Sequence, residues 1–303
     1  GKDLGSVSVA PDGSFLLVTE QQSNGTSKVY RVDTATGAAV SAGEDGSPFL
    51  DAQTVHAHTA ILTGGGHDHV QLLNLDTMTY SDMNGGISYS NNSFLSHDGH
   101  LTLFAEDGIS DGPLFVYDDR VGQVVAAGDD YQGGSGFNQG VQAISEAAGQ
   151  IAQFIYYSSI FIYDLDVKFQ YEVDFAAPLN GIAYDESGKY AYVYLQTGEV
   201  DKMETRHWHQ VASFNVGIEG TYNQPFADSL MVDSTDSYIV IKASVGGSLS
   251  LVDLSAANAT YKGTSGGDAF AGGDGNDTYV VNNAADTIVE NAIEGFDRVK
   301  SSI

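Results

Sequence analysis

The chain has 303 residues with 12 Lys or Arg against 40 Asp or Glu, so its formal net charge at pH 7 is −28. Nucleic acid and anionic membrane surfaces attract cationic chains, so this balance excludes nucleic acid as a partner, and divalent cations are the natural partners. No stretch approaches the length of a membrane span, so no membrane insertion is expected, and the first residues lack the basic start and apolar run of a signal peptide. The absence of cysteine argues against a disulfide-stapled fold, and 42% hydrophobic residues can form a sizeable core.

A repeated pattern runs from residue 4 to about residue 260: a turn, an alternating apolar strand, a second turn, and a strand that ends in an acidic residue. These strand-ending acids are Asp33, Asp76, Asp118, Asp164, Glu204 and Asp253. Their spacing gives a period of about 44 residues, which leaves room for four short strands in each unit. The pattern predicts an all-β fold, a six- or seven-bladed β-propeller. The alternative is a β-sandwich, whose strands recur about every 8 to 12 residues without a longer period.

The stretch "APDGSFLLV…VYRVDTATG" resembles the propeller repeats of bacterial surface proteins and lactonases. This resemblance implies the fold and fixes no activity. After residue 260 glycine and aspartate dominate, so we predict a propeller over residues 1–260 and a separate module over residues 261–303.

The C-terminal module reads in nines as "GTSGGDAFA" (263–271), "GGDGNDTYV" (272–280) and "VNNAADTIV" (281–289). Each nine keeps an aspartate with a large apolar residue two positions later, and Asp297 with Val299 continues the pattern. Glycine permits tight turns, and hard oxygen ligands at a crowded site select calcium. The predicted calcium-site residues are Asp268, Gly272, Gly273, Gly275, Asp277, Asp286 and Asp297. The alternative is a glycine-rich linker with scattered acids.

The stretch "GGDGNDTYVV", followed by "DTIVENAIEGFDRVKSSI", resembles the RTX (haemolysin-type) calcium-binding repeat of proteins exported by type I secretion. The resemblance implies a short parallel β-roll in which calcium bridges turns stacked on the same side, pairing Asp268 with Asp286. The glycines missing from "VNNAAD" imply a weaker site at Asp286. It also implies an extracellular or cell-surface location, folding deferred until after export, and a longer natural chain.

The eight histidines form four close pairs: His56 with His58, His67 with His69, His97 with His100, and His207 with His209. Alternate residues on a strand share one face, so two imidazoles can meet one metal ion, although zinc requires three or four ligands. In a propeller, the first and third pairs fall at equivalent turns of adjacent units.

One hypothesis is therefore a zinc or copper site built from His56, His58, His97 and His100, with His67, His69, His207 and His209 as secondary candidates. The other is that all of these are solvated turn residues. "SFLSHDGHLTLFAEDG" also resembles a short stretch of periplasmic zinc-chaperone propellers.

Three function classes remain open. A binding or adhesion module for carbohydrate or for cell-surface and matrix components is favoured over an enzyme. Propeller lactonases hold a catalytic calcium in the central channel, and the resemblance would place Asn138, Asn180 and Asp228 there, although such residues are also ordinary turn formers. The third class is a structural component that self-assembles in a surface layer or matrix.

Overall fold

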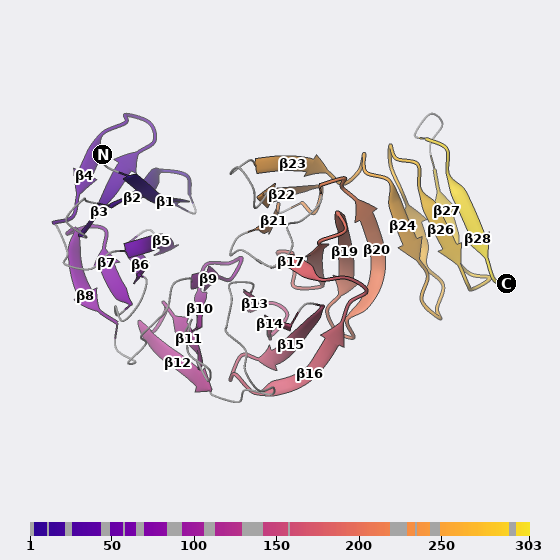
Figure 1. The fold of residues 1–303 in the computed structure, drawn as a ribbon, viewed down its shortest axis with the longest axis horizontal. Coiled ribbons are helices and arrows are strands. Elements are labelled where there is room, and N and C mark those ends of the chain that lie inside the picture. The colour runs from indigo at the N-terminus through magenta and orange to yellow at the C-terminus, as the bar shows by residue number, and fades with distance from the viewer. Residues whose placement is uncertain are drawn as a thin grey trace. The chain divides into compact units, whose positions relative to one another are not determined.

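The computed structural model describes residues 3–10, 12–21, 26–43, 49–56, 58–64, 70–83, 93–105, 113–128, 142–156, 158–218, 229–233, 235–242, 249–290 and 295–303. Every regular element in these ranges is a β-strand (Figure 1). The chain divides into two compact units. One comprises Gly1–Glu146 with Ile162–Tyr171, and the other comprises Ala147–Phe161 with Glu172–Ile303.

Three four-stranded antiparallel sheets, each in chain order, make up most of the first unit. The first contains β1 (Asp3–Val9), β2 (Phe15–Gln21), β3 (Ser27–Asp33) and β4 (Ala39–Ser41). The second contains β5 (Phe49–His56), β6 (Thr59–Gly64), β7 (Gln71–Asn74) and β8 (Thr79–Asp82). The third contains β9 (Ser93–Leu95), β10 (Leu101–Ala105), β11 (Leu114–Asp118) and β12 (Gln123–Gly128).

A fourth sheet contains β13 (Gln142–Ser145), β14 (Gln150–Tyr156), β15 (Ser159–Asp164) and β16 (Phe169–Asp174), and the division between units passes through it. In the second unit, a sheet begins with β17 (Leu179–Tyr184), β18 (Tyr190–Leu195), β19 (Glu199–Glu204) and β20 (His209–Asn215). A separate three-stranded sheet contains β21 (Leu230–Val232), β22 (Tyr238–Lys242) and β23 (Leu249–Asp253).

The turn between the third and fourth strands shares two features across the five sheets that begin with β1, β5, β9, β13 and β17. The residue that ends the third strand is Asp33, Asn74, Asp118, Asp164 or Glu204, and its side-chain oxygen accepts a backbone N–H from within the turn. The last turn position has a positive φ and is occupied by Gly37, Met78, Gly122, Val167 or Trp208. Short side-chain acceptors stabilise such turns, so most of the repeated strand-ending acids are turn caps.

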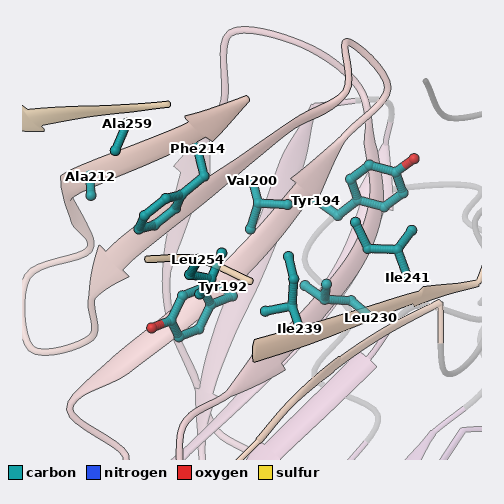
Figure 2. Packing of buried hydrophobic residues seen from close by; sticks show 10 residues of the cluster. All are labelled: Tyr192, Tyr194, Val200, Ala212, Phe214, Leu230, Ile239, Ile241, Leu254 and Ala259. Atoms are coloured by element: carbon teal, nitrogen blue, oxygen red, sulfur yellow. The ribbon is translucent and has the colours of Figure 1, made fainter. Parts of the chain in front are cut away.

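Alternating strand residues form the core between neighbouring sheets of the same unit. In the second unit, the cluster contains Tyr192, Tyr194, Val200, Ala212, Phe214, Leu230, Ile239, Ile241, Leu254 and Ala259 (Figure 2). In the first unit, Phe15 and Leu17 of β2 pack with Leu62 of β6 and Leu73 of β7. Successive strand residues point to opposite faces, so the alternating pattern of the sequence buries one face of each strand in these clusters.

The C-terminal strands change from antiparallel to parallel pairing. They are β24 (Ala259–Lys262), β25 (Ala269–Ala271), β26 (Thr278–Val281), β27 (Thr287–Val289) and β28 (Arg298–Ser301). β24, β26 and β28 form one parallel ladder that continues the sheet from β20, and β25 and β27 form another (Figure 1). Thr260 pairs with Thr278 and Ala269 with Thr287, so neighbouring strands are offset by two nine-residue repeats.

The prediction of six or seven blades is wrong, because the described residues form five four-stranded blades. The sixth sheet, β21 to β23, has three strands among the described residues. β24, which would supply the fourth, pairs antiparallel with β20 instead. Tyr261 of β24 packs edge-on against Phe214 of β20, with ring centroids 6.3 Å apart, and stacks on Tyr279 of β26 at 5.5 Å. These aromatic contacts join β24 to the fifth sheet, and the predicted domain boundary at residue 260 falls inside this strand.

Candidate metal centre

Three carboxylates converge beside the parallel ladders. Asp277 immediately precedes β26, Glu290 follows β27, and Asp297 immediately precedes β28. One carboxylate oxygen from each lies within 4.8 Å of the other two. Asp277 is only 1% exposed. Because parallel strands start at the same edge, the aspartates before β26 and β28 are brought together by strand pairing itself.

Asp277 is held from two sides by backbone hydrogen bonds. Its Oδ1 accepts the N–H of Ala259 at 2.7 Å, and its own N–H donates to Asp297 Oδ1 at 2.9 Å. Its second oxygen, Oδ2, is buried and has no hydrogen-bond partner among the described residues. Beside it, the buried hydroxyl of Tyr279 donates to Glu290 Oε1. An unpaired buried carboxylate oxygen is costly, so this atom is the feature that points to a bound cation.

The electrostatics lead to the same conclusion. Burial raises the pKa of Asp277 above its ordinary value, and the Asp297 carboxylate adds to the rise, while the hydrogen bond from Ala259 partly offsets it. Burial, with the nearby charges of Asp277 and Glu290, raises the pKa of Tyr261 to about 12. The three carboxylates therefore concentrate negative charge in a site that is partly shielded from water. A divalent cation bound there would offset that charge.

The glycines of "GGDGNDTYV" have separate steric reasons. A Cβ on Gly272 would lie 2.0 Å from Asp277 Oδ2, and one on Gly275 would lie 2.6 Å from the Ala257 carbonyl oxygen. Gly273 has a φ of +86°, and a Cβ there would lie 2.5 Å from the Ser255 carbonyl oxygen. All three predicted positions therefore require glycine, and Gly272 directly lines the carboxylate site.

Asp268 and Asp286 meet on the other ladder, where the N–H of Asp268 donates to Asp286 Oδ1 at 2.9 Å. This side differs from the Asp277 side because its oxygens have protein partners. Asp268 accepts the N–H of Thr264 at 2.7 Å, and the side-chain amides of Asn282 and Asn283 donate to the carbonyl oxygens of Gly263 and Ser265, each at 2.7 Å. The pKa of Asp286 is lowered, first by the backbone N–H of Asp268.

The predicted histidine site is not brought together among the described side chains. His58 Nδ1 lies 2.9 Å from Asp76 in the second sheet, and His100 Nδ1 lies 3.3 Å from Asp119 in the third. His97 lies in the exposed turn before β10. The side chain of His56 and both residues of the His67–His69 pair lie outside what the structure describes.

The pair His207 and His209 does meet a third ligating side chain. Glu204, His207 and His209 place one ligating atom each within 4.8 Å of the others. In the described parts of the chain, this cluster and the Asp277 cluster are the places where three such side chains converge.

Two residues of these clusters were missed by the sequence analysis. Glu290 occupies no fixed position of the nine-residue repeat, so only the three-dimensional path after β27 brings it to Asp277. Glu204 does carry a signal in the sequence, because it is the strand-ending acid of its repeat and lies three residues before His207.

Of the residues proposed for a central channel, Asn180 lies on β17 and is 5% exposed. Its backbone carbonyl accepts the Ser229 hydroxyl. Asn138 and Asp228 lie outside the described residues.

No helix in the described residues is long and apolar enough to cross a membrane. No protein-family model and no curated protein matches the chain. Among solved structures, the Dos1 propeller is similar, with a TM-score of 0.62 and 12% sequence identity, covering 83% of this chain and 68% of that chain. At this identity the likeness shows the fold alone: the chain is an all-β propeller.

Proposed function

We propose that this protein is a secreted propeller whose C-terminal strands form a calcium-binding β-roll of RTX type. The observation that carries the proposal is the buried Asp277 Oδ2, which has no hydrogen-bond partner among the described residues and belongs to a carboxylate that converges with those of Glu290 and Asp297. Oxygen donors, net anionic charge and a glycine-lined turn are what calcium sites use. Asp277, Glu290 and Asp297 would hold the ion, which supplies the positive charge that the buried carboxylate requires.

Asp268 and Asp286 would form a second, weaker site. Calcium sites of this kind use backbone carbonyl oxygens as well as carboxylates. On this ladder the amides of Asn282 and Asn283 already bond two such carbonyls, so a calcium ion would have to displace them. Asn282, which replaces the second glycine of the repeat, and its neighbour Asn283 therefore support a turn that needs less calcium on this side.

The role that follows is calcium-dependent folding. Without the ion, the converging carboxylates repel one another and the buried charge of Asp277 has no counter-charge. The C-terminal strands are therefore destabilised. With the ion, its binding free energy becomes folding free energy for β24, β26 and β28. Such a module would fold where calcium is plentiful, which fits export of the chain before it folds.

Calcium titration of thermal unfolding tests this proposal on the full chain. Calcium is expected to raise the unfolding temperature of the unaltered protein, and Asp277→Asn is expected to remove most of that increase. Asp274→Asn is the matched control, because Asp274 lies in the same turn, is exposed, and lies outside the carboxylate cluster. Equal calcium responses of the two variants would contradict the proposal.

For the propeller itself we propose a binding or adhesion role toward carbohydrate or matrix components outside the cell. Large apolar side chains on the exposed faces of several strands support it, among them Tyr171 of β16, Tyr238 of β22 and Leu251 of β23. Aromatic faces stack on sugar rings, and apolar patches mark binding surfaces. A glycan array probed with calcium-loaded protein would support the role if binding fell on Tyr238→Ala, and absence of any glycan or matrix binding would contradict it.

A second candidate is a metal-dependent propeller hydrolase. The observation in its favour is the polar side chain of Asn180, which is buried on β17 and interacts with the Tyr194 hydroxyl. Lactone hydrolysis that is lost in Asn180→Ala would establish this candidate. If the calcium-loaded protein does not hydrolyse lactones, this candidate is rejected and the binding role is retained.

A further inference from the structure

We propose that Glu204, His207 and His209 form a binding site for a divalent transition-metal ion of the zinc class, separate from the calcium cluster. The three residues lie at the turn between β19 and β20. Glu204 is the last residue of β19 and pairs directly with His209, the first residue of β20. The donor set is two imidazoles and one carboxylate, which is a known three-ligand combination for zinc.

The distances match a tetrahedral site. His207 Nδ1 and His209 Nδ1 each lie 3.4 Å from the same oxygen, Glu204 Oε2. This is longer than the usual N–H···O distance of about 2.7–3.2 Å. Zinc–ligand distances of about 2.0–2.2 Å imply ligand–ligand separations of about 3.3–3.6 Å in a tetrahedron. Two edges of the proposed tetrahedron therefore already have the length that the ion requires.

The turn is held in place before any ion binds. Trp208, between the two histidines, has a φ of +51° and is buried, with its ring edge-on to Tyr184 at 6.1 Å. Gln150 ties the turn at two points: its Oε1 accepts the indole N–H of Trp208 at 3.2 Å, and its Nε2 donates to the Thr205 carbonyl at 3.2 Å. A ligand set on a fixed backbone loses less freedom on binding, so pre-organisation favours affinity.

The anchored tryptophan also explains why the histidines face solvent. Trp208 is directed into the core, and the residues on either side of it are accessible, with side-chain exposures of 68% for His207 and 41% for His209. The Glu204 side chain is 19% exposed, and its Oε2 lies near both imidazoles. The arrangement supplies three protein ligands and leaves the fourth position to water or to a ligand from outside.

The equivalent turns of the other sheets lack this donor set wherever the structure describes them. The equivalent turns of the first and third sheets place Gly37 and Gly122 at the position of Trp208, and they begin with the shorter aspartate. Among the described residues, the strand-ending acid meets two imidazoles only in the sheet of β17–β20. Imidazole suits zinc, copper and nickel, whereas calcium takes oxygen ligands, so the two proposed centres select different ions.

The test uses the only tryptophan of the chain, Trp208, as a probe next to the site. Copper(II) added to calcium-loaded full-length protein is expected to quench Trp208 fluorescence at one equivalent. Because copper(II) binds such ligands more tightly than zinc, zinc in large excess is expected to reverse the quenching by competition. Calorimetric titration with zinc is expected to show a dissociation constant of about 1 μM or lower.

The variants His207→Ala and His209→Ala are each expected to weaken zinc binding by about tenfold or more and to abolish the zinc-reversible quenching. His58→Ala is the matched control, since His58 is an exposed turn histidine that also lies beside a carboxylate. Both ligand side chains are exposed, and unchanged circular dichroism would show that the variants fold. Unaltered zinc affinity in both His207→Ala and His209→Ala, or an equal loss in His58→Ala, would overturn the proposal.

Discussion

Replacing Gly272 by alanine tests whether Asp277 is as tightly enclosed as the structure indicates. The new Cβ would lie 2.0 Å from Asp277 Oδ2 and 2.1 Å from the Tyr279 hydroxyl oxygen, where ordinary contact is 3.4–4 Å. Neither atom can withdraw freely. The other oxygen of Asp277 accepts the Ala259 N–H, and the Tyr279 hydroxyl donates to Glu290.

The expected cost follows from these contacts. Overpacking a filled site costs about 1–3 kcal/mol. Turning the carboxylate away from Ala259 would instead give up a hydrogen bond to a charged group, worth about 1.5–3 kcal/mol. Either route destabilises the parallel ladders by about 2 kcal/mol. Backbone amides that become exposed when these strands open should then exchange their hydrogens about 30-fold faster.

Native-state hydrogen exchange of the calcium-loaded protein measures this directly, because the parallel ladders are proposed to be folded in that state. The informative amides are those of Ala259, bonded to Asp277, and Gly263, bonded to the Val280 carbonyl. Gly266→Ala is the matched control, since its Cβ would meet nothing closer than Thr264 Oγ1 at 3.6 Å, and a change below about 0.5 kcal/mol is expected. Equal exchange rates in the two variants would refute the enclosure of Asp277.

Three further predictions concern the blades. Burial raises the pKa of Asp201, which is 8% exposed, so its contribution to stability is present below its unfolded pKa of about 3.9 and is lost as pH rises through the folded pKa. Asp201→Asn should therefore gain stability relative to the unaltered protein between about pH 4 and pH 7 in urea unfolding, and a constant difference would count against this reasoning. Ile239→Ala, in the core shown in Figure 2, should cost about 2–5 kcal/mol by calorimetry, and a loss below about 1 kcal/mol would be inconsistent with its complete burial. Gly37→Ala, with a φ of +70° and no atom within 4 Å of the new Cβ, should cost about 1–2 kcal/mol from backbone strain alone, whereas a neutral result would argue against that turn conformation.

The strand pattern of the propeller could be predicted because it is local. The apolar alternation in "LFVYD" and "IFIYD" corresponds to β11 and β15, and each of these strands ends at the predicted acid. In the second sheet the turn cap is Asn74, two residues before the predicted Asp76, because β7 ends earlier. Local sequence therefore predicts the strands, while their ends depend on which side chain satisfies the turn.

The partner of β24 could not be predicted in this way. "ATYK" has the composition of an ordinary fourth strand, and its pairing with β20 depends on contacts of Tyr261 with Phe214 and Tyr279, which are far apart in sequence. The same limit applies to the candidate site. The nine-residue spacing points to Asp277, whereas the approach of Glu290 follows from the chain path beyond the repeat.

The position of bound calcium in crystals grown with the ion tests the central proposal most directly. The account predicts an anomalous difference peak about 2.3–2.6 Å from Asp277 Oδ2, contacted also by Glu290 and Asp297. A weaker peak, or none, is expected between Asp268 and Asp286. Full occupancy between Asp268 and Asp286 with nothing at Asp277 would contradict the account.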